Sequence, residues 1–224
     1  MRRIRGKKVV DLPAAEFAAL TARYRKVILD VGTGDGKHAL QLAREHPDQL
    51  VVGLDAAKDN LRKVSSRSDP ANLLFVWAPV EQLPVELTGI GEVHVLMPWG
   101  SLLRALLDPG APVLAELARR CEPESPFLIT LNLHAWRPPV PEVGEHPEPT
   151  PSSALADLAT GYRTAGWRLD AAGYLDDAEI ARLATSWTRR LNSSRDQLAV
   201  LALTGRINPG QSADSPPDSD STNW

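Results

Sequence analysis

Glycines and acids near the start of the chain form the pattern with the clearest chemistry. Gly32, Gly34 and Gly36 follow a short apolar run and precede an amphipathic stretch, which predicts a strand, a tight turn and a helix. Glycines at alternate positions let a ligand lie against the backbone without a Cβ in the way. A second apolar run ends at Asp55, where a carboxylate can hold both hydroxyls of a ribose. The pattern therefore predicts a nucleoside-binding βαβ unit.

Two further acids, Asp30 and Asp35, flank these glycines. Dinucleotide sites bring a pyrophosphate onto the helix N-terminus and favour the spacing G-x-G-x-x-G, whereas the spacing here is G-x-G-x-G. Carboxylates would repel a pyrophosphate, while the methionine end of S-adenosylmethionine (SAM) carries an ammonium and a sulfonium. Charge therefore favours SAM over a dinucleotide. An ordinary βα turn without a ligand is the alternative.

The fourth apolar run is followed by Met97-Pro98-Trp99, at the sheet edge where ligands of such folds bind. Enzymes that methylate exocyclic amines usually place Asn or Asp, then Pro-Pro and an aromatic residue, at this point, so that an acceptor aims the amine. Here the aromatic residue is present and the acceptor is missing. A ring nitrogen such as N1 of adenine already has an in-plane lone pair, so stacking and positioning are sufficient.

Length and composition limit the class of protein. The 224 residues correspond to one large domain or two small ones. A single cysteine, Cys121, excludes an internal disulfide and fits a reducing cytoplasm. Five scattered histidines and no cysteine pairs argue against a metal site. There is no apolar span of about 20 residues for a membrane helix, and acids interrupt the segment after the basic N-terminus, against a secretory signal.

Charge is unevenly distributed along the chain. Residues 208–224 contain three aspartates and no Lys or Arg, so we expect a folded domain at 1–207 and a disordered acidic tail at 208–224. The remainder has 25 basic and 25 acidic side chains, and its bases cluster. Such clusters predict local patches for a polyanion, with solvated surface charge as the alternative. The three clusters are Arg2, Arg3, Arg5, Lys7 and Lys8; Arg62, Lys63 and Arg67; and Arg189, Arg190 and Arg195.

Alternating strand and helix patterns predict an α/β fold with helices on both faces of a mostly parallel sheet. A β-hairpin at 4–12 precedes the core, Ser152 or Ser153 caps a helix that runs to Trp167, and the proline-rich stretch 135–151 is a functional or mobile loop. Trp77 and Trp167 are expected in the core, and Trp136 is unassigned. The predicted strands lie at 27–31, 50–54, 73–78, 93–97, 127–133, 169–175 and 197–203, the last one antiparallel. This seven-stranded arrangement resembles class I, Rossmann-like, SAM-dependent methyltransferases.

Four motifs make the resemblance more specific: Gly6-Lys7-Lys8-Val9-Val10-Asp11-Leu12, the glycine motif at 30–37, Leu96-Met97-Pro98-Trp99-Gly100-Ser101, and Thr185-Ser186-Trp187 with Arg190 and Arg195. Together they are similar to the Kam family of 16S ribosomal RNA adenine-N1 methyltransferases, which confer aminoglycoside resistance by modifying adenosine 1408 of the decoding site. The likeness covers about residues 1–207. The paired tryptophans with their neighbouring arginines are its most specific part.

The resemblance implies transfer of a methyl group from SAM to N1 of adenosine 1408 in the small (30S) subunit by a cytoplasmic monomer without a metal. It implies that Trp99 and Trp187 stack on either side of the flipped adenine. The SAM-binding residues would be Asp30, Gly32, Gly34, His38, Asp55, Ala56, Val80, Glu81, Leu96, Thr185 and Ser186. The RNA-binding residues would be Arg62, Lys63, Arg67, Arg190 and Arg195.

Three other functions are compatible with parts of the pattern. A tRNA guanine-N7 methyltransferase would share the fold, the donor and the basic surface, but not the tryptophan pair. A non-catalytic RNA-binding protein could keep SAM as a structural ligand. A small-molecule methyltransferase would not need three basic clusters.

Overall fold

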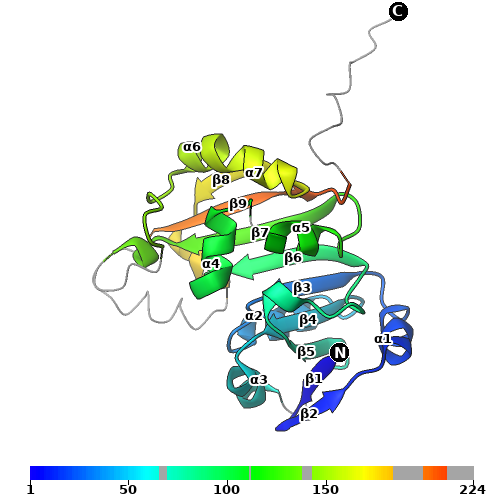
Figure 1. Ribbon diagram of the computed structural model, residues 1–224. Helices are drawn as coiled ribbons and strands as arrows, with labels where there is room; N and C mark the ends of the chain where they lie inside the picture. Colours follow the sequence, from blue (N-terminus) through cyan, green and yellow to red (C-terminus); the bar gives the residue numbers. More distant parts are fainter. Residues whose placement is uncertain (66–69, 111, 138–142, 184–198, 211–224) are drawn as a thin grey trace, which may run out of the picture.

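The computed structural model describes residues 1–65, 70–110, 112–137, 143–183 and 199–210. Within these residues nine strands form one sheet in the order β2-β1-β5-β4-β3-β6-β7-β9-β8 (Figure 1). The pairs among β3 to β7 are parallel, and β9 pairs antiparallel with both β7 and β8, as the sequence predicts. The strands of this core are β3 (Val27–Val31), β4 (Leu50–Asp55), β5 (Leu73–Trp77), β6 (Ile90–Leu96), β7 (Ser125–Asn132), β8 (Trp167–Tyr174) and β9 (Val200–Ile207).

The N-terminal hairpin is part of the same sheet. It consists of β1 (Arg2–Arg5) and β2 (Lys8–Asp11), and β1 pairs antiparallel with β5, with Ile4 opposite Phe75. The hairpin therefore extends the predicted seven-stranded sheet to nine strands among the residues described. A hydrogen bond of 2.9 Å from the backbone nitrogen of Gly6 to Ser65 Oγ ties its turn to the end of α3 (Lys58–Val64).

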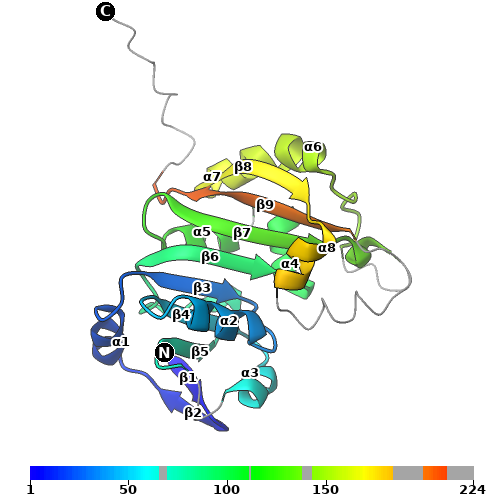
Figure 2. The ribbon, with the colours of Figure 1, turned by 180° about the vertical axis from the view of Figure 1, so that it is seen from behind.

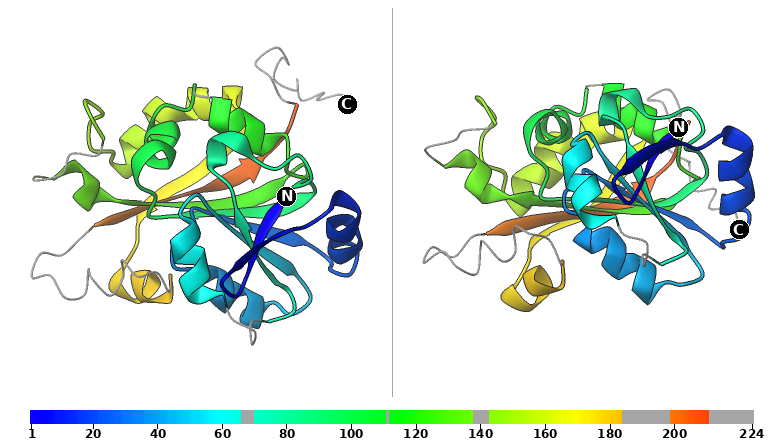
Figure 3. Two further views of the ribbon diagram at one scale, coloured as in Figure 1. Left: turned by 60° about the horizontal axis from the view of Figure 1, so that its bottom comes forward. Right: turned by 90° about the horizontal axis from the view of Figure 1, so that it is seen from below.

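Helices cover both faces of the sheet, which explains why every residue of β3 is buried. Figures 2 and 3 show α4 to α7 on one face and α2, α3 and α8 on the other. Helix α1 (Ala14–Thr21) follows the hairpin and begins after Pro13, which is its N-cap. The remaining helices are α2 (Lys37–Glu45), α4 (Gly100–Leu107), α5 (Pro112–Ala118), α6 (Pro151–Ser153), α7 (Ala159–Thr164) and α8 (Asp177–Arg182).

The two faces hold separate apolar clusters. Leu103 and Leu106 of α4 pack with Leu114 and Leu117 of α5 in the larger cluster, together with Trp167, whose indole Nε1 donates to the Leu114 carbonyl at 2.9 Å. Ala39, Leu42, Ala43 and Leu61 pack against Ile28, Val51 and Phe75 on the other face. Trp167 is fully buried, so its predicted core role is confirmed.

The helix predicted at 152–167 begins one residue earlier, ends at Thr164 and is not uniform, and Trp167 is instead the first residue of β8. Thr150 is the N-cap: its Oγ1 accepts from the Ser153 backbone nitrogen at 3.1 Å, and Ser153 Oγ accepts from the Thr150 nitrogen at 2.9 Å. The prediction of Ser152 or Ser153 as N-cap is therefore wrong, because the reciprocal capping box starts at Thr150. A π-helical turn at Ala154–Leu158 separates α6 from α7.

Two further predictions need correction. The stretch 135–151 is not structureless where it is described: Leu133–Trp136 forms a 3-10 turn, Trp136 Nε1 donates to the His146 carbonyl at 2.9 Å, and Val143 is buried. Trp77 is only half-buried, since it ends β5 near the sheet edge, with Arg2 over its ring at 4.1 Å. Residues 138–142, and 211–224 of the predicted tail, lie outside the described residues.

Candidate functional site

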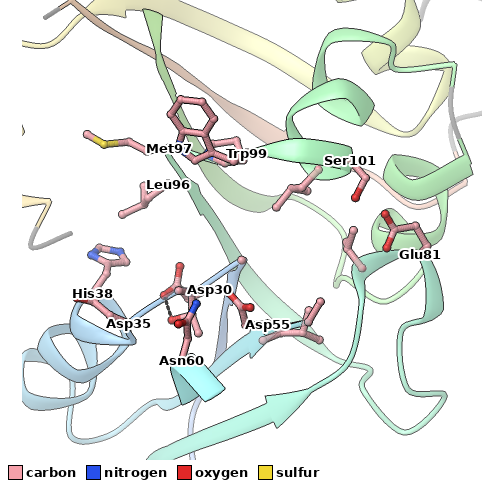
Figure 4. Close-up of a pocket in the computed structure, with 18 residues that line it drawn as sticks. Asp30, Asp35, His38, Asp55, Asn60, Glu81, Leu96, Met97, Trp99 and Ser101 are labelled. Carbon is pink, nitrogen blue, oxygen red and sulfur yellow. Dashed lines mark hydrogen bonds between the residues drawn. The ribbon is translucent and has the colours of Figure 1, made fainter. Parts of the chain in front are cut away.

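A cavity of about 340 Å³ lies at the carboxyl ends of β3, β4 and β6 (Figure 4). Its lining includes four carboxylates and one histidine, and no described Lys or Arg lines it. Figure 4 shows Met97 and Trp99 on the side of the cavity opposite Asp30 and Asp55. The lining residues are Asp30, Gly32, Thr33, Gly34, Asp35, His38, Leu54, Asp55, Ala56, Asn60, Val80, Glu81, Leu96, Met97, Pro98, Trp99, Ser101 and Leu102. Such a lining favours a ligand that carries positive charge.

The glycine loop between β3 and α2 forms one wall. Gly32 has φ +70°, in the left-handed region, and a Cβ there would lie 2.9 Å from Leu102 Cδ2. The backbone nitrogens of Gly32 and Thr33 donate to the Leu54 carbonyl at 2.8 and 3.0 Å, which holds the loop against β4. At Gly34 a Cβ would meet only the Gly32 carbonyl, 3.9 Å away, so the loop surface there is open to a ligand.

Asp55 joins this loop to the end of β4. Its Oδ2 accepts a hydrogen bond of 2.8 Å from the Gly34 backbone nitrogen, and its Oδ1 accepts one of 2.6 Å from the Ala57 nitrogen. Burial raises the pKa of Asp55, and Asp30 raises it slightly further, while these two hydrogen bonds lower it. Each carboxylate oxygen keeps a second lone pair, so Asp55 can position the loop and still accept from ligand hydroxyls.

Asp30, near the end of β3, is almost completely buried at 2% exposure. Thr33 Oγ1 donates to its Oδ2 at 2.5 Å, which fixes the carboxylate orientation within the loop. Asp35 forms an ion pair with Lys37 at the start of α2, so part of its charge is already compensated. Asp30 and Asp55 are therefore the carboxylates best placed to interact with a cationic or hydroxyl-bearing ligand.

The chain turns sharply where β6 ends. Met97 has φ +49°, which is strained for a residue with a side chain, and its backbone nitrogen is held by the Thr130 carbonyl at 2.9 Å. The Met97 side chain is buried with Leu96, Ile180 and Leu183. The turn brings the half-buried Trp99, the N-cap of α4, to the cavity edge.

Ten of the predicted donor-site and catalytic residues line the cavity. They are Asp30, Gly32, Gly34, His38, Asp55, Ala56, Val80, Glu81, Leu96 and Trp99. Thr185, Ser186 and Trp187 lie outside the described residues, as do Arg67, Arg190 and Arg195. Of the predicted RNA-binding residues, Arg62 and Lys63 are described. Both lie in the last turn of α3, with Lys63 exposed and Arg62 paired with Asp59 at 3.5 Å.

Sequence reasoning missed several lining residues. Asn60 and Ser101 are two polar ones, and each lies near the start of the helix that follows β4 or β6. The rule that ligands bind beyond the carboxyl ends of parallel strands could have found both. Thr33 and Asp35 lie within the glycine motif, and the Thr33 hydroxyl donates to Asp30. Leu54, Met97, Pro98 and Leu102 contribute through backbone or apolar contact, for which the sequence has no separate signal.

Two other kinds of site were searched for in the described part of the chain. Its His, Cys, Asp and Glu side chains form no group of three or more that could hold a metal ion. Among its helices, none has the length and hydropathy needed to cross a bilayer.

Known proteins share both the sequence and this architecture. The model of the NpmA family, described as 16S rRNA (adenine(1408)-N(1))-methyltransferase, matches residues 2–206. A 16S rRNA (adenine(1408)-N(1))-methyltransferase of Streptoalloteichus hindustanus is 57% identical over 216 residues, which covers 93% of this chain and 100% of the relative.

Two solved structures are also similar. The crystal structure of the 16S rRNA methyltransferase KamB has a TM-score of 0.88 at 54% identity, covering 93% of this chain and 100% of KamB. A mutant of the 16S rRNA (adenine(1408)-N(1))-methyltransferase from Catenulisporales acidiphilia, solved with the cosubstrate SAM, has a TM-score of 0.84 at 31% identity, covering 97% of this chain and 100% of that one. With the glycine loop, the acidic cavity and Trp99 in place, the chain belongs to the 16S rRNA (adenine(1408)-N(1))-methyltransferase family.

Proposed function

We propose that this protein transfers a methyl group from SAM to N1 of adenosine 1408 in 16S rRNA, and so protects the decoding site from aminoglycosides. One observation carries the proposal: an acidic, glycine-walled cavity lies next to Trp99 at the carboxyl edge of the sheet. Membership of the family and the SAM-bound neighbour support the reaction and the donor.

The residues of the cavity fit SAM. Four carboxylates without a lining Lys or Arg suit its ammonium and sulfonium, and the open surface at Gly34 leaves room beside the loop. Asp55 would accept from the ribose hydroxyls, while Ala56, Val80 and Glu81 would surround the adenine end. Asp30, Gly32, His38 and Leu96 would border the remainder, with Thr185 and Ser186 contributing from outside the described residues. When bound, SAM supplies an electrophilic methyl group for direct attack by a ring nitrogen.

The role of this chain toward the acceptor is to stack and orient a base. An adenine in helical RNA must leave its stack before N1 becomes accessible. Stacking between Trp99 and Trp187 would offset that cost at roughly 1–3 kcal/mol per base. A general base is unnecessary because N1 has a free lone pair, which agrees with the absence of Asn or Asp at Met97-Pro98. The methylated base carries a fixed positive charge, which repels cationic drugs.

We further propose that residues 1–207 act as one monomeric domain on the assembled 30S subunit in the cytoplasm. Arg62 and Lys63 on α3, with Arg67, Arg190 and Arg195, would contact RNA phosphates. Phosphate contacts supply most of the affinity of such interfaces, whereas the base contact supplies the specificity.

Primer extension across 16S rRNA tests the proposal. Purified protein and SAM are incubated with isolated 30S subunits or with naked 16S rRNA, and reverse transcription then maps the modified position. We expect a stop next to adenosine 1408, because a base methylated at N1 cannot pair. Methylation of tRNA guanine instead would identify the alternative enzyme, and SAM binding without methyl transfer would identify a non-catalytic RNA-binding protein.

A further inference from the structure

Four polar side chains form a hydrogen-bonded series beside β6, and the last of them, His38, lines the cavity. Lys26 Nζ donates to Glu92 Oε2 at 2.5 Å, and Glu92 Oε1 lies 2.8 Å from His94 Nε2. His94 Nδ1 lies 2.8 Å from His38 Nε2, and the two imidazole rings stack with centroids 5.0 Å apart. Both histidines are buried, so the chain is a polar link in the otherwise apolar layer between α2 and the sheet.

Glu92 determines the direction of these hydrogen bonds. The hydrogen bond from His94, with a smaller contribution from Lys26, lowers the pKa of Glu92 to about 2 against the effect of burial. The carboxylate is therefore ionised at neutral pH and only accepts, so His94 Nε2 carries a proton. Between His94 Nδ1 and His38 Nε2 one nitrogen donates and the other accepts, and the tautomers of the two rings decide which. Where His94 Nδ1 accepts, Nε2 of neutral His38 carries the proton and its Nδ1 is unprotonated.

Nδ1 of His38 is the atom of this hydrogen-bonded series that can take up a proton. This atom is buried and has no hydrogen-bond partner among the described residues. The Leu183 carbonyl, just after α8, lies close enough to favour protonated His38. In the tautomer with an unprotonated Nδ1, the carbonyl and this ring nitrogen are both acceptors and cannot bond until His38 gains a proton. His38 therefore has two states, which differ by one proton and one unit of charge.

The surroundings of His38 decide which state is present. Burial is the largest effect and lowers the pKa of His38, and His94 lowers it further. The carboxylates of Asp30 and Glu45, together with the Leu183 carbonyl, act in the opposite direction but do not overcome burial. A histidine with a lowered pKa is neutral at pH 7, so the resting state of His38 is uncharged.

Protonation would change the electrostatics of the cavity. Among the described lining residues, His38 is the one that can become positive, since the other titratable ones are carboxylates and no Lys or Arg is present. The charge would appear beside Asp30 in the part of the cavity formed by the loop and the start of α2. A positive charge there disfavours a cationic ligand relative to a neutral one.

We propose that His38, hydrogen-bonded to His94, links donor binding to protonation, so that neutral His38 favours SAM and protonated His38 favours the demethylated product. This rests on SAM being the ligand of the cavity. SAM carries a sulfonium charge that S-adenosylhomocysteine lacks, whereas the two share the ammonium, carboxylate, ribose and adenine. His94 does not line the cavity and acts as a positioning residue through His38. The pair thus makes the balance between donor and product depend on pH.

Isothermal titration calorimetry of the full chain measures this linkage directly. SAM and S-adenosylhomocysteine are each titrated from about pH 5.5 to 8, in pairs of buffers with different ionisation enthalpies. Below the pKa of His38, we expect SAM binding to release protons from the protein. In this range the Kd for SAM should rise by up to about tenfold for each pH unit that the pH is lowered. S-adenosylhomocysteine should release fewer protons and show a flatter pH profile.

Two variants and a control separate the pair from other titrating groups. His94→Gln keeps an acceptor for His38 and a donor for Glu92 but removes the ring that lowers the pKa of His38, so the transition in SAM affinity should move to higher pH. Glu92→Gln removes a negative charge near the pair, so the transition should move to lower pH. His46→Gln on the segment after α2 is the matched control and should behave as wild type. Thermal melting confirms that each variant is folded.

The outcomes are distinct from those of the proposed function. Equal proton release by SAM and product in the wild type would overturn the linkage, as would His94→Gln with its transition at the wild-type pH. If SAM does not bind at neutral pH, the proposed function fails as well. If SAM binds and RNA is methylated but no linkage is seen, only this inference fails.

Discussion

The carboxylate of Asp55 accepts a hydrogen bond of 2.8 Å from the backbone nitrogen of Gly34, so the last residue of β4 directly holds the loop that follows β3. The same carboxylate also accepts from Ala57. One side chain therefore organises the backbone on both sides of the cavity before any ligand binds. This arrangement means that a substitution at Asp55 removes a proposed ribose contact and loosens the loop together.

Asp55→Ala should weaken SAM binding by roughly 10- to 100-fold, the range expected when a charged hydrogen-bond acceptor is lost. Calorimetry at neutral pH measures the affinity, and circular dichroism checks that the fold is kept. Asp55→Asn keeps one acceptor oxygen and should lose less affinity. An unchanged Kd for Asp55→Ala would remove this residue from the donor site.

Trp99→Ala should abolish most methylation while SAM affinity and the melting temperature remain close to wild type, because Trp99 is half-buried at the cavity edge. Trp99→Phe should retain part of the activity, since a smaller ring still stacks. Trp187→Ala should behave like Trp99→Ala if both tryptophans hold the base.

Trp167→Ala is the matched control for a structural tryptophan. It removes a fully buried ring and the hydrogen bond to Leu114, so it should cost roughly 3–5 kcal/mol of unfolding free energy. Activity and thermal stability are measured on the same preparations. A parallel loss of both in Trp99→Ala would indicate that Trp99 is a core residue and not a stacking surface.

Charge reversal on α3 tests the RNA interface. Lys63→Glu and Arg62→Glu should each weaken binding to 30S subunits and lower the salt dependence of log K by about one phosphate contact, without changing SAM affinity. Arg190→Glu and Arg195→Glu should act in the same way. Arg163→Glu on α7, an exposed position on the opposite face of the sheet, is the control. If the α3 variants bind 30S subunits as tightly as the wild type, Arg62 and Lys63 are solvated surface charges and not RNA contacts.

The lowered pKa of Glu92 leads us to predict that the folded protein loses stability in acid. Its pKa is lowered to about 2 in the folded protein, first by His94 and then by Lys26, so the stabilisation is present above the unfolded pKa of about 4.3. It is lost as the pH falls from there toward 2, by on the order of 1–3 kcal/mol. Urea unfolding of wild type and Glu92→Gln at pH 7 and at pH 3 should show a difference between them at the higher pH that narrows at the lower one.

Much of the architecture could be predicted because it depends on local patterns. The apolar runs and the glycine loop give the parallel strands, and Asp55 marks the end of β4 in both sequence and structure. The pairing of the hairpin with β5 could not be predicted, because strand neighbours far apart in sequence leave no local signal. The same is true of the contact between Arg2 of the hairpin and the half-buried ring of Trp77.

The site residues also divide into those that sequence spacing predicts and those that only packing reveals. Residues at or just after strand ends, such as Asp30, Asp55 and Trp99, could be found from spacing alone. The link between His38 and His94 joins residues 56 positions apart, so only the packing of α2 on β6 reveals it. The positive φ of Met97 is equally invisible in the sequence, because a methionine before a proline carries no turn signal.

The hairpin also changes which strand forms the exposed edge of the sheet. Without it, the buried strand β5 would form an open edge with free backbone groups, a template for association between copies. Instead the outer strand is β2, which is only four residues long and carries Lys8 and Asp11, while the opposite edge strand, β8, has an irregularity between Leu169 and Ala171 and an Arg168–Asp170 ion pair. Both borders of the sheet are thus short, charged or irregular. Such borders protect the sheet from edge-to-edge association, and we expect truncation of residues 1–12 to make the protein prone to aggregation.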